Sequence, residues 1–339
     1  MCRGEPVDAD RSTGYDGDMN DLFTADDRNK INAAMLAGSN KRFDELLAER
    51  PKPSFWWHLL GWVIWLPLFL IGAIVTGSSP IAGIAILIVT LALGVLVTRW
   101  FARWMHRRKL RTQARLEVVG GYATDRGWTM VDSIPLGATT PLLREGDRRS
   151  TGWGVMGELG EGTRFCAGYY LYEVRERSTD SDGNTTETWQ QHPYTIALID
   201  AALPDLKQLS IHKGKTGGIL SKLGGAVSSL RPVPLESEEF NKAFQLMVAD
   251  DAEELAIRSR FTPSIQVAFI DRGAGTSRAE AENSVLMVAR TGQPRTDDFG
   301  TLMDILGDAL WLRAVLTDTP PGRLPDVPSL RKILIGDEA

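Results

Sequence analysis

The amino-acid sequence predicts an α+β protein in which a two-helix transmembrane hairpin precedes a β-rich cytoplasmic domain closed by a C-terminal helix. Three observations predict this fold class. Residues 55–98 contain no Asp, Glu, Lys or Arg, and each half supplies about 20 residues, the length of a membrane-spanning helix. Residues 165–200 read as two strands joined by a polar turn. Residues 297–315 place their apolar side chains on one helical face.

The two apolar stretches meet at residues 77–80, a Gly-Ser-Ser-Pro turn without charge. A helical hairpin in a soluble core would carry a polar face, and neither stretch has one. Lys and Arg are concentrated just outside the two other ends, which by the positive-inside rule places both termini in the cytoplasm and residues 78–79 outside. We therefore expect a bacterial plasma-membrane protein with two spans.

Tryptophan and basic residues at the cytoplasmic ends of the hairpin predict how it is anchored. Indole rings favour the headgroup layer, and each Lys or Arg near an anionic leaflet contributes about 1 kcal/mol of attraction. The expected partner is thus a bilayer with anionic headgroups. The predicted anchor residues are Trp56, Trp57, Trp100, Arg103, Trp104, Arg107, Arg108, Lys109 and Arg111.

Composition divides the chain into six predicted segments. Residues 1–23 are polar and poor in apolar side chains, which indicates disorder. Residues 24–52 predict two short cytoplasmic helices, with Thr24 as the N-cap of the first and a break near Gly38-Ser39-Asn40. The hairpin at 53–101 is followed by a basic juxtamembrane helix at 102–122, the cytoplasmic α+β domain at 123–318 and a proline-rich tail at 319–339.

Within the α+β domain, periodicity predicts the individual elements. Strands are expected over residues 165–174, 185–200, 206–212, 233–236, 240–248 and 285–289, and helices over 250–259, 264–271 and 297–315.

Composition also narrows the class of protein. The formal charge of −5 in 339 residues argues against a nucleic-acid partner, because such proteins carry a basic groove. The two cysteines, Cys2 and Cys166, are too few for a disulfide framework. The four histidines show no metal-ligand spacing. The sequence predicts no cofactor, no metal and no catalytic residue.

Two arrangements would support an enzyme instead. Cys166 and His192 could act as nucleophile and base across the predicted hairpin, although no third orienting group is evident. Glu236 and Asp250 could form an acid pair. The alternatives to a binding protein are therefore a membrane-tethered hydrolase that uses Cys166 or a carboxylate pair, or an accessory subunit of a transport complex.

One segment resembles a known family. A Glu-Ser pair precedes a Phe-Asn-x-x-Phe strand, an acidic turn and a Thr-Pro helix start. The segment resembles the one that marks a family of uncharacterised bacterial membrane proteins, whose domain of unknown function follows one or two transmembrane helices. The resemblance covers residues 152–292 and implies a membrane-tethered α+β domain without assigned catalytic residues. Its residues are Leu235, Glu236, Ser237, Phe240, Asn241, Phe244, Thr262 and Pro263.

From these observations we expect a membrane-anchored, non-enzymatic interaction or scaffold protein. The hairpin would hold the cytoplasmic domain at the inner face of the plasma membrane, where the domain would bind a protein partner. A homo-oligomer is compatible with the sequence.

Overall fold

The structure, a computed structural model, describes residues 24–49, 80–137, 139–179, 185–203, 207–214, 230–272, 276–293, 299–318 and 323–335. The chain divides into two compact units. The first contains residues 1–28, 131–294 and 300–339, and the second contains residues 29–130 and 295–299.

Two long helices dominate the second unit. α1 (Ala25–Glu49) begins in the first unit and continues into the second, and α3 (Pro80–Asp125) has 46 residues, a length of about 70 Å. The start of α1 confirms Thr24 as its cap. The Asp27 N–H donates to Thr24 Oγ1 at 3.2 Å, and the Thr24 N–H donates to Asp27 Oδ2 at 2.9 Å, which is a reciprocal capping arrangement.

The predicted break in α1 is wrong, because one helix continues through Gly38-Ser39-Asn40. Gly38 faces α3 so closely that an added Cβ would stand 3.2 Å from Val118 Cγ1. Packing of two helices at this glycine outweighs its low helix propensity of about 1 kcal/mol.

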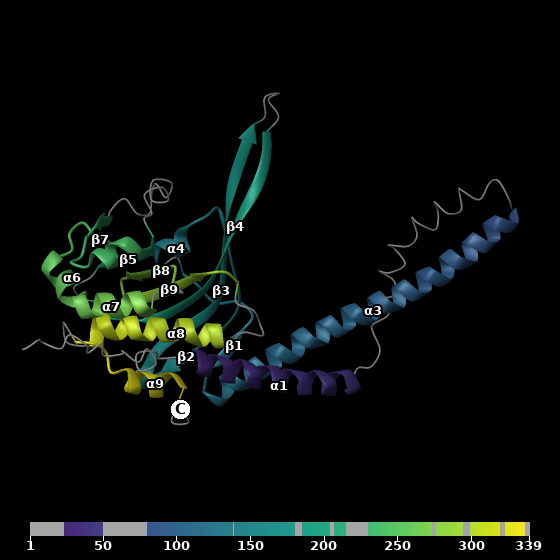
Figure 1. Ribbon diagram of the computed structural model, residues 1–339, viewed down its shortest axis with the longest axis horizontal. Helices are drawn as coiled ribbons and strands as arrows, with labels where there is room; N and C mark the ends of the chain where they lie inside the picture. Colours follow the sequence, from purple (N-terminus) through teal and green to yellow (C-terminus); the bar gives the residue numbers. More distant parts are fainter. Residues whose placement is uncertain are drawn as a thin grey trace, which may run out of the picture. The chain divides into compact units, whose positions relative to one another are not determined.

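Nine strands fall within the described residues and form one sheet in the order β1-β2-β3-β4-β9-β8-β5-β7-β6 (Figure 1). The strands β2 to β9 belong to the first unit, and the division between the units falls within β1. Across the sheet, from β2 to the edge strand β6, each strand runs antiparallel to its neighbour. Their bounds are β1 (Thr129–Val131), β2 (Arg148–Leu159), β3 (Thr163–Thr179), β4 (Thr185–Asp200), β5 (Gln208–Lys213), β6 (Leu230–Pro232), β7 (Phe244–Ala249), β8 (Arg278–Glu282) and β9 (Val285–Thr291).

Helical residues pack on both faces of this sheet. On one face, Phe269 and Trp311 lie over Ala279 and Val288 around a cavity of about 10 Å³. On the other face, Leu142 packs with sheet residues including Tyr170 and Met287. The described helices of this unit are α4 (Pro141–Arg144), α5 (Glu238–Ala243), α6 (Glu254–Arg260), α7 (Pro263–Arg272), α8 (Phe299–Arg313) and α9 (Val327–Ile335), with short η3 (Gly160–Gly162) and the π-helical η4 (Ala314–Asp318).

The α+β class, the large antiparallel sheet and the C-terminal helix are confirmed. β4 has the predicted bounds, and α8 buries the predicted apolar face completely at Phe299, Leu302 and Leu306. One strand prediction is wrong and a second is right only in part, because the strand predicted over residues 240–248 begins at Phe244 as β7. Residues 233–236 are not a strand in the structure, and residues 238–243 form α5. Ser237 caps this helix and two acids occupy its first turn, so local capping prevails over the apolar alternation.

The predicted transmembrane hairpin has no support in the structure. Across the part of the chain that is described, we find no helix that is both long enough and apolar enough to cross a membrane. Residues 50–79, which hold the first predicted span, lie outside the described residues, and side chains of α3 are described only from residue 92. The hairpin, its topology and the predicted segment boundaries stay predictions.

Candidate functional site

The described members of the predicted anchor set all lie on α3, in the second unit. One side of α3 packs on α1 through a core of Leu46, Leu110 and Ala114. Arg42 of α1 donates to Glu117 of α3 at 2.6 Å, so this carboxylate is engaged at the helix pair. Trp56 and Trp57 lie outside the described residues.

Apolar side chains occupy an exposed stretch of α3. Leu93, Leu96 and Val97 are 52%, 64% and 40% exposed, and Trp100 and Trp104 are 65% and 44% exposed. The two indole rings stack with centroids 6.4 Å apart and planes 11° apart. Large apolar side chains gathered on a surface commonly mark contact with a membrane or a protein.

Basic side chains follow directly on the same helix. Arg108 lies 5.6 Å from the centroid of the Trp104 ring. Arg103, Arg107 and Arg111 recur every four residues and therefore share one face. A hollow of about 640 Å³ runs between the indoles and this arginine row. Guanidinium groups bind phosphate oxygens with two parallel hydrogen bonds, so the chemistry of this surface suits anionic phosphate. The five exposed basic residues are Arg103, Arg107, Arg108, Lys109 and Arg111.

The family-like segment forms a second, structural cluster in the first unit. The Asn241 side chain accepts from the Leu235 N–H at 3.0 Å and donates to the Leu235 carbonyl at 2.7 Å. Ser237 Oγ accepts the Phe240 N–H at 3.1 Å. These bonds close the turn that enters α5. The rings of Phe240 and Phe244 lie 5.4 Å apart in the core.

Gln266 ties this segment together, although sequence reasoning missed it. The side chain is fully buried. Its Oε1 accepts the Ser237 N–H at 3.0 Å, and its Nε2 donates to Glu236 Oε2 at 3.1 Å and to the Phe261 carbonyl at 2.6 Å. A buried amide with three such bonds is a structural element. Pro263 begins α7, in agreement with the Thr-Pro helix start, but the Thr262 hydroxyl does not cap the helix, because Thr262 Oγ1 has no hydrogen-bond partner among the described residues.

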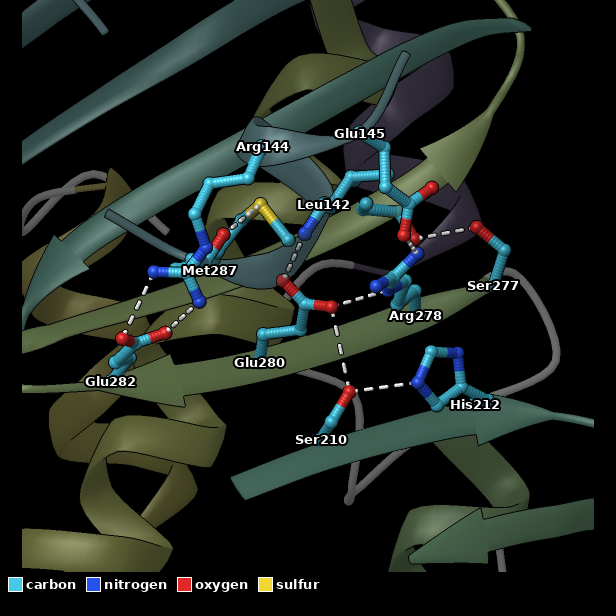
Figure 2. Close-up of polar contacts among 12 residues, drawn as sticks. Leu142, Arg144, Glu145, Ser210, His212, Ser277, Arg278, Glu280, Glu282 and Met287 are labelled. Atoms are coloured by element: carbon cyan, nitrogen blue, oxygen red, sulfur yellow. Dashed lines mark hydrogen bonds and ion pairs between the residues drawn. The ribbon is translucent and has the colours of Figure 1, made fainter. Parts of the chain in front are cut away.

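A buried polar network lies on the sheet face below α4 (Figure 2). The Arg278 guanidinium donates to Glu145 and to Glu280, and the second oxygen of Glu280 accepts the Leu142 N–H at 2.8 Å. Arg278 and Glu145 are 6% and 8% exposed, and Glu280 is fully buried. Two carboxylates therefore share one guanidinium. Burial raises the pKa of Glu145, against the attraction of Arg278.

Ser210 and His212 extend this network along β5. Ser210 Oγ lies 2.8 Å from His212 Nε2 and 3.4 Å from Glu280 Oε1. The three residue types match those of a hydrolytic triad, but the carboxylate contacts the hydroxyl, whereas a triad carboxylate orients the imidazole. Ser210 is 1% exposed and His212 is 6% exposed. Burial, with Arg278 nearby, lowers the pKa of His212 to about 3. This arrangement is a packed structural network.

The structure supports neither of the two residue pairs that would indicate an enzyme. Cys166 pairs with Leu198 across β3 and β4, whereas His192 pairs with Tyr172, six residues and about 20 Å along the strand. The proposed nucleophile and base therefore do not meet. Burial raises the pKa of the Cys166 thiol to about 12, so it is not a thiolate at neutral pH. Glu236 is engaged by Arg258 at 2.7 Å and by Gln266, so the acid pair with Asp250 has no support either.

Comparison with known proteins assigns no family. No family model matches the chain, and no curated protein matches it. A search of solved structures finds a similarity to the crystal structure of the mycobacterial trehalose monomycolate transport factor A, TtfA. The sequence identity is 10%, the TM-score is 0.35, and the match covers 60% of this chain and 94% of that one.

Proposed function

We propose that this protein is a membrane-anchored, non-enzymatic interaction protein, which holds its α+β domain at the inner face of a bacterial plasma membrane. One observation carries the proposal. The exposed surface of α3 passes along the helix from Leu93, Leu96 and Val97 through the stacked Trp100 and Trp104 to five exposed basic residues. This order matches the layers of a bilayer. Apolar side chains suit the hydrocarbon core, tryptophans suit the headgroup layer, and basic side chains suit the anionic surface.

The sequence adds support for two spans. Residues 81–98 carry no charge and continue directly into this surface within one helix. Residues 55–76 likewise carry no charge, and the sequence Gly-Ser-Ser-Pro at 77–80 separates the two stretches. Binding rather than catalysis is favoured because Ser210 and His212, whose residue types match those of a hydrolytic triad, are closed off from solvent.

The topology is tested with reporters in the full-length protein. A reporter fused after Ala339 should be active only in the cytoplasm, and one inserted between Ser78 and Ser79 only outside. The positive-inside bias around residues 99–115 is the physical reason. Reversed signals from the two fusions would overturn the cytoplasmic assignment.

The anionic contact is tested by neutralising the five basic residues of α3 to Gln. In lipid nanodiscs, amide exchange of α3 beyond Arg103 should be slower with anionic than with neutral lipid, and the difference should shrink as salt rises, because attraction is screened within a Debye length of about 10 Å at 0.1 M. The five-residue variant should lose this difference and give mixed topology.

A matched control removes the same charge elsewhere. Neutralising five exposed basic residues of the first unit should leave the lipid dependence of α3 unchanged; these are Arg164, Arg175, Arg177, Lys207 and Lys242. Equal protection of α3 in neutral and anionic nanodiscs would leave the basic residues as a topology signal alone.

A further inference from the structure

The strands β3 and β4 extend past the rest of the sheet as a two-stranded ribbon (Figure 1). Pairing of β2 with β3 ends at Glu173, and pairing of β4 with β9 ends at Tyr194. We call residues 174–179 and 185–192 the β-arm. Its side chains are exposed except for Val174, Trp189 and His192, which are half-buried. A two-stranded ribbon alone in water is marginally stable.

The two outer edges of the β-arm differ. On the β3 edge, the Arg175 N–H already donates to Asp147 at 2.8 Å, and the sequence Arg175-Glu176-Arg177 supplies the charges that protect an edge. The β4 edge reads Thr-Thr-Glu-Thr-Trp-Gln-Gln over residues 185–191, without Lys, Pro or Gly. Its one charge, Glu187, is paired with Arg177 at 2.8 Å.

The direction of the backbone groups on the β4 edge follows from a neighbouring bond. The Pro193 carbonyl accepts from the Gly292 N–H at 2.8 Å on the β9 side. Backbone groups alternate along a strand, so residues 185, 187, 189 and 191 also direct their N–H and C=O groups outward. Among the described residues nothing pairs with them.

We propose that the β4 edge of the β-arm pairs with the same edge of a second copy of this chain, antiparallel and centred on Thr188. In this register Glu187 stands opposite Trp189 of the second copy and Thr185 opposite Gln191, with about eight main-chain hydrogen bonds between the copies. The Arg148 guanidinium covers Trp189 at 3.8 Å from the ring centroid. Each Glu187 carboxylate thus meets a guanidinium of the other copy.

The sequence disfavours the neighbouring registers. A centre at Glu187 places two carboxylates directly opposite each other, which is destabilising. A centre at Trp189 places Pro193, which has no N–H, opposite Thr185, so two bonds are lost. A two-fold centre at Thr188 avoids both costs, and this self-complementarity favours a second copy over an unrelated strand.

Cysteine cross-linking of the full-length protein in membranes tests the register, on a background with Cys2→Ala. Residue 188 faces itself as a non-hydrogen-bonded pair with Cα atoms about 4.5 Å apart, within disulfide range. Thr188→Cys should therefore give a disulfide-linked dimer. Thr186→Cys alone should not, but a mixture of Thr186→Cys and Gln190→Cys chains should cross-link.

The mass of the purified protein, measured by light scattering, gives a second test. The unmodified protein should be a dimer, and Gln191→Pro, which removes an outward N–H, should be a monomer. Thr179→Pro is the matched control, because it removes an outward N–H from the β3 edge and should leave the dimer intact. A monomeric unmodified protein, or equal cross-linking of Thr186→Cys and Thr188→Cys chains, would overturn the proposal.

Discussion

Replacement of Arg278 by Met is expected to lower the free energy of unfolding by about 3–5 kcal/mol, because removing one partner of a buried ion pair leaves an uncompensated charge. Here two carboxylates, Glu145 and Glu280, lose the guanidinium that they share. Urea denaturation of the full-length protein, followed by near-UV circular dichroism, should show a lower midpoint at an unchanged slope.

Arg144→Met is the matched control. Its guanidinium pairs with Glu282 at 3.0 and 2.6 Å, but the two side chains are 31% and 18% exposed, so we expect a loss of about 1 kcal/mol. Adding Glu145→Gln and Glu280→Gln to Arg278→Met should recover part of the stability, since neither carboxylate then leaves an unpaired charge in this network. If Arg278→Met costs no more than Arg144→Met, the network does not stabilise the fold through charge.

The stability contributed by His212 is expected to fall with pH below 6.5. Its folded-state pKa is lowered to about 3, against 6.5 in the unfolded chain, so the unfolded state binds the proton first. The contribution is fully present above pH 6.5 and is lost by about 1.4 kcal/mol per pH unit as the pH falls towards 3. Between pH 6.5 and 4.5 the loss is about 2–3 kcal/mol.

His212→Gln removes this titration and provides the reference. Asp308 titrates in the same range with the opposite sign: its pKa is raised to about 6, mainly by burial, so acidification from pH 6 towards 3.8 stabilises the fold through this group. The difference in unfolding free energy between the unmodified protein and His212→Gln cancels the effect of Asp308. A difference that stays constant from pH 6.5 to 4.5 would show that the imidazole accepts a proton in the folded state.

Local signals in the sequence predicted several elements well. The bounds of β4, the apolar face of α8 and the Thr24 cap each depend on residues within one or two turns or on simple alternation. The succession of apolar, aromatic and basic residues along α3 is also visible in the sequence alone, and its contact with a membrane stays a prediction. Such features need no knowledge of distant residues.

Other features of the fold could not be predicted from residues that are neighbours in the sequence. The strand β8 has the sequence Arg-Ala-Glu-Ala-Glu, and three charged residues in five argue against a buried central strand. The alternation of alanine with charged residues is typical of a strand, but it does not reveal which residues neutralise the charges. Gln266 likewise gains its role only because Ser237 and Glu236 approach it across the fold.

By itself, the sequence determined the α+β class, the paired strands β3 and β4, the closing helix and the charged and aromatic surface of α3. Tertiary structure alone decided that α1 is one helix, that Cys166 and His192 stay apart, and that Arg278 and Glu280 are buried. The physical reason is that burial of a charge depends on its partner. Glu145 reaches Arg278 from 133 positions away in the chain, and no local pattern encodes that contact.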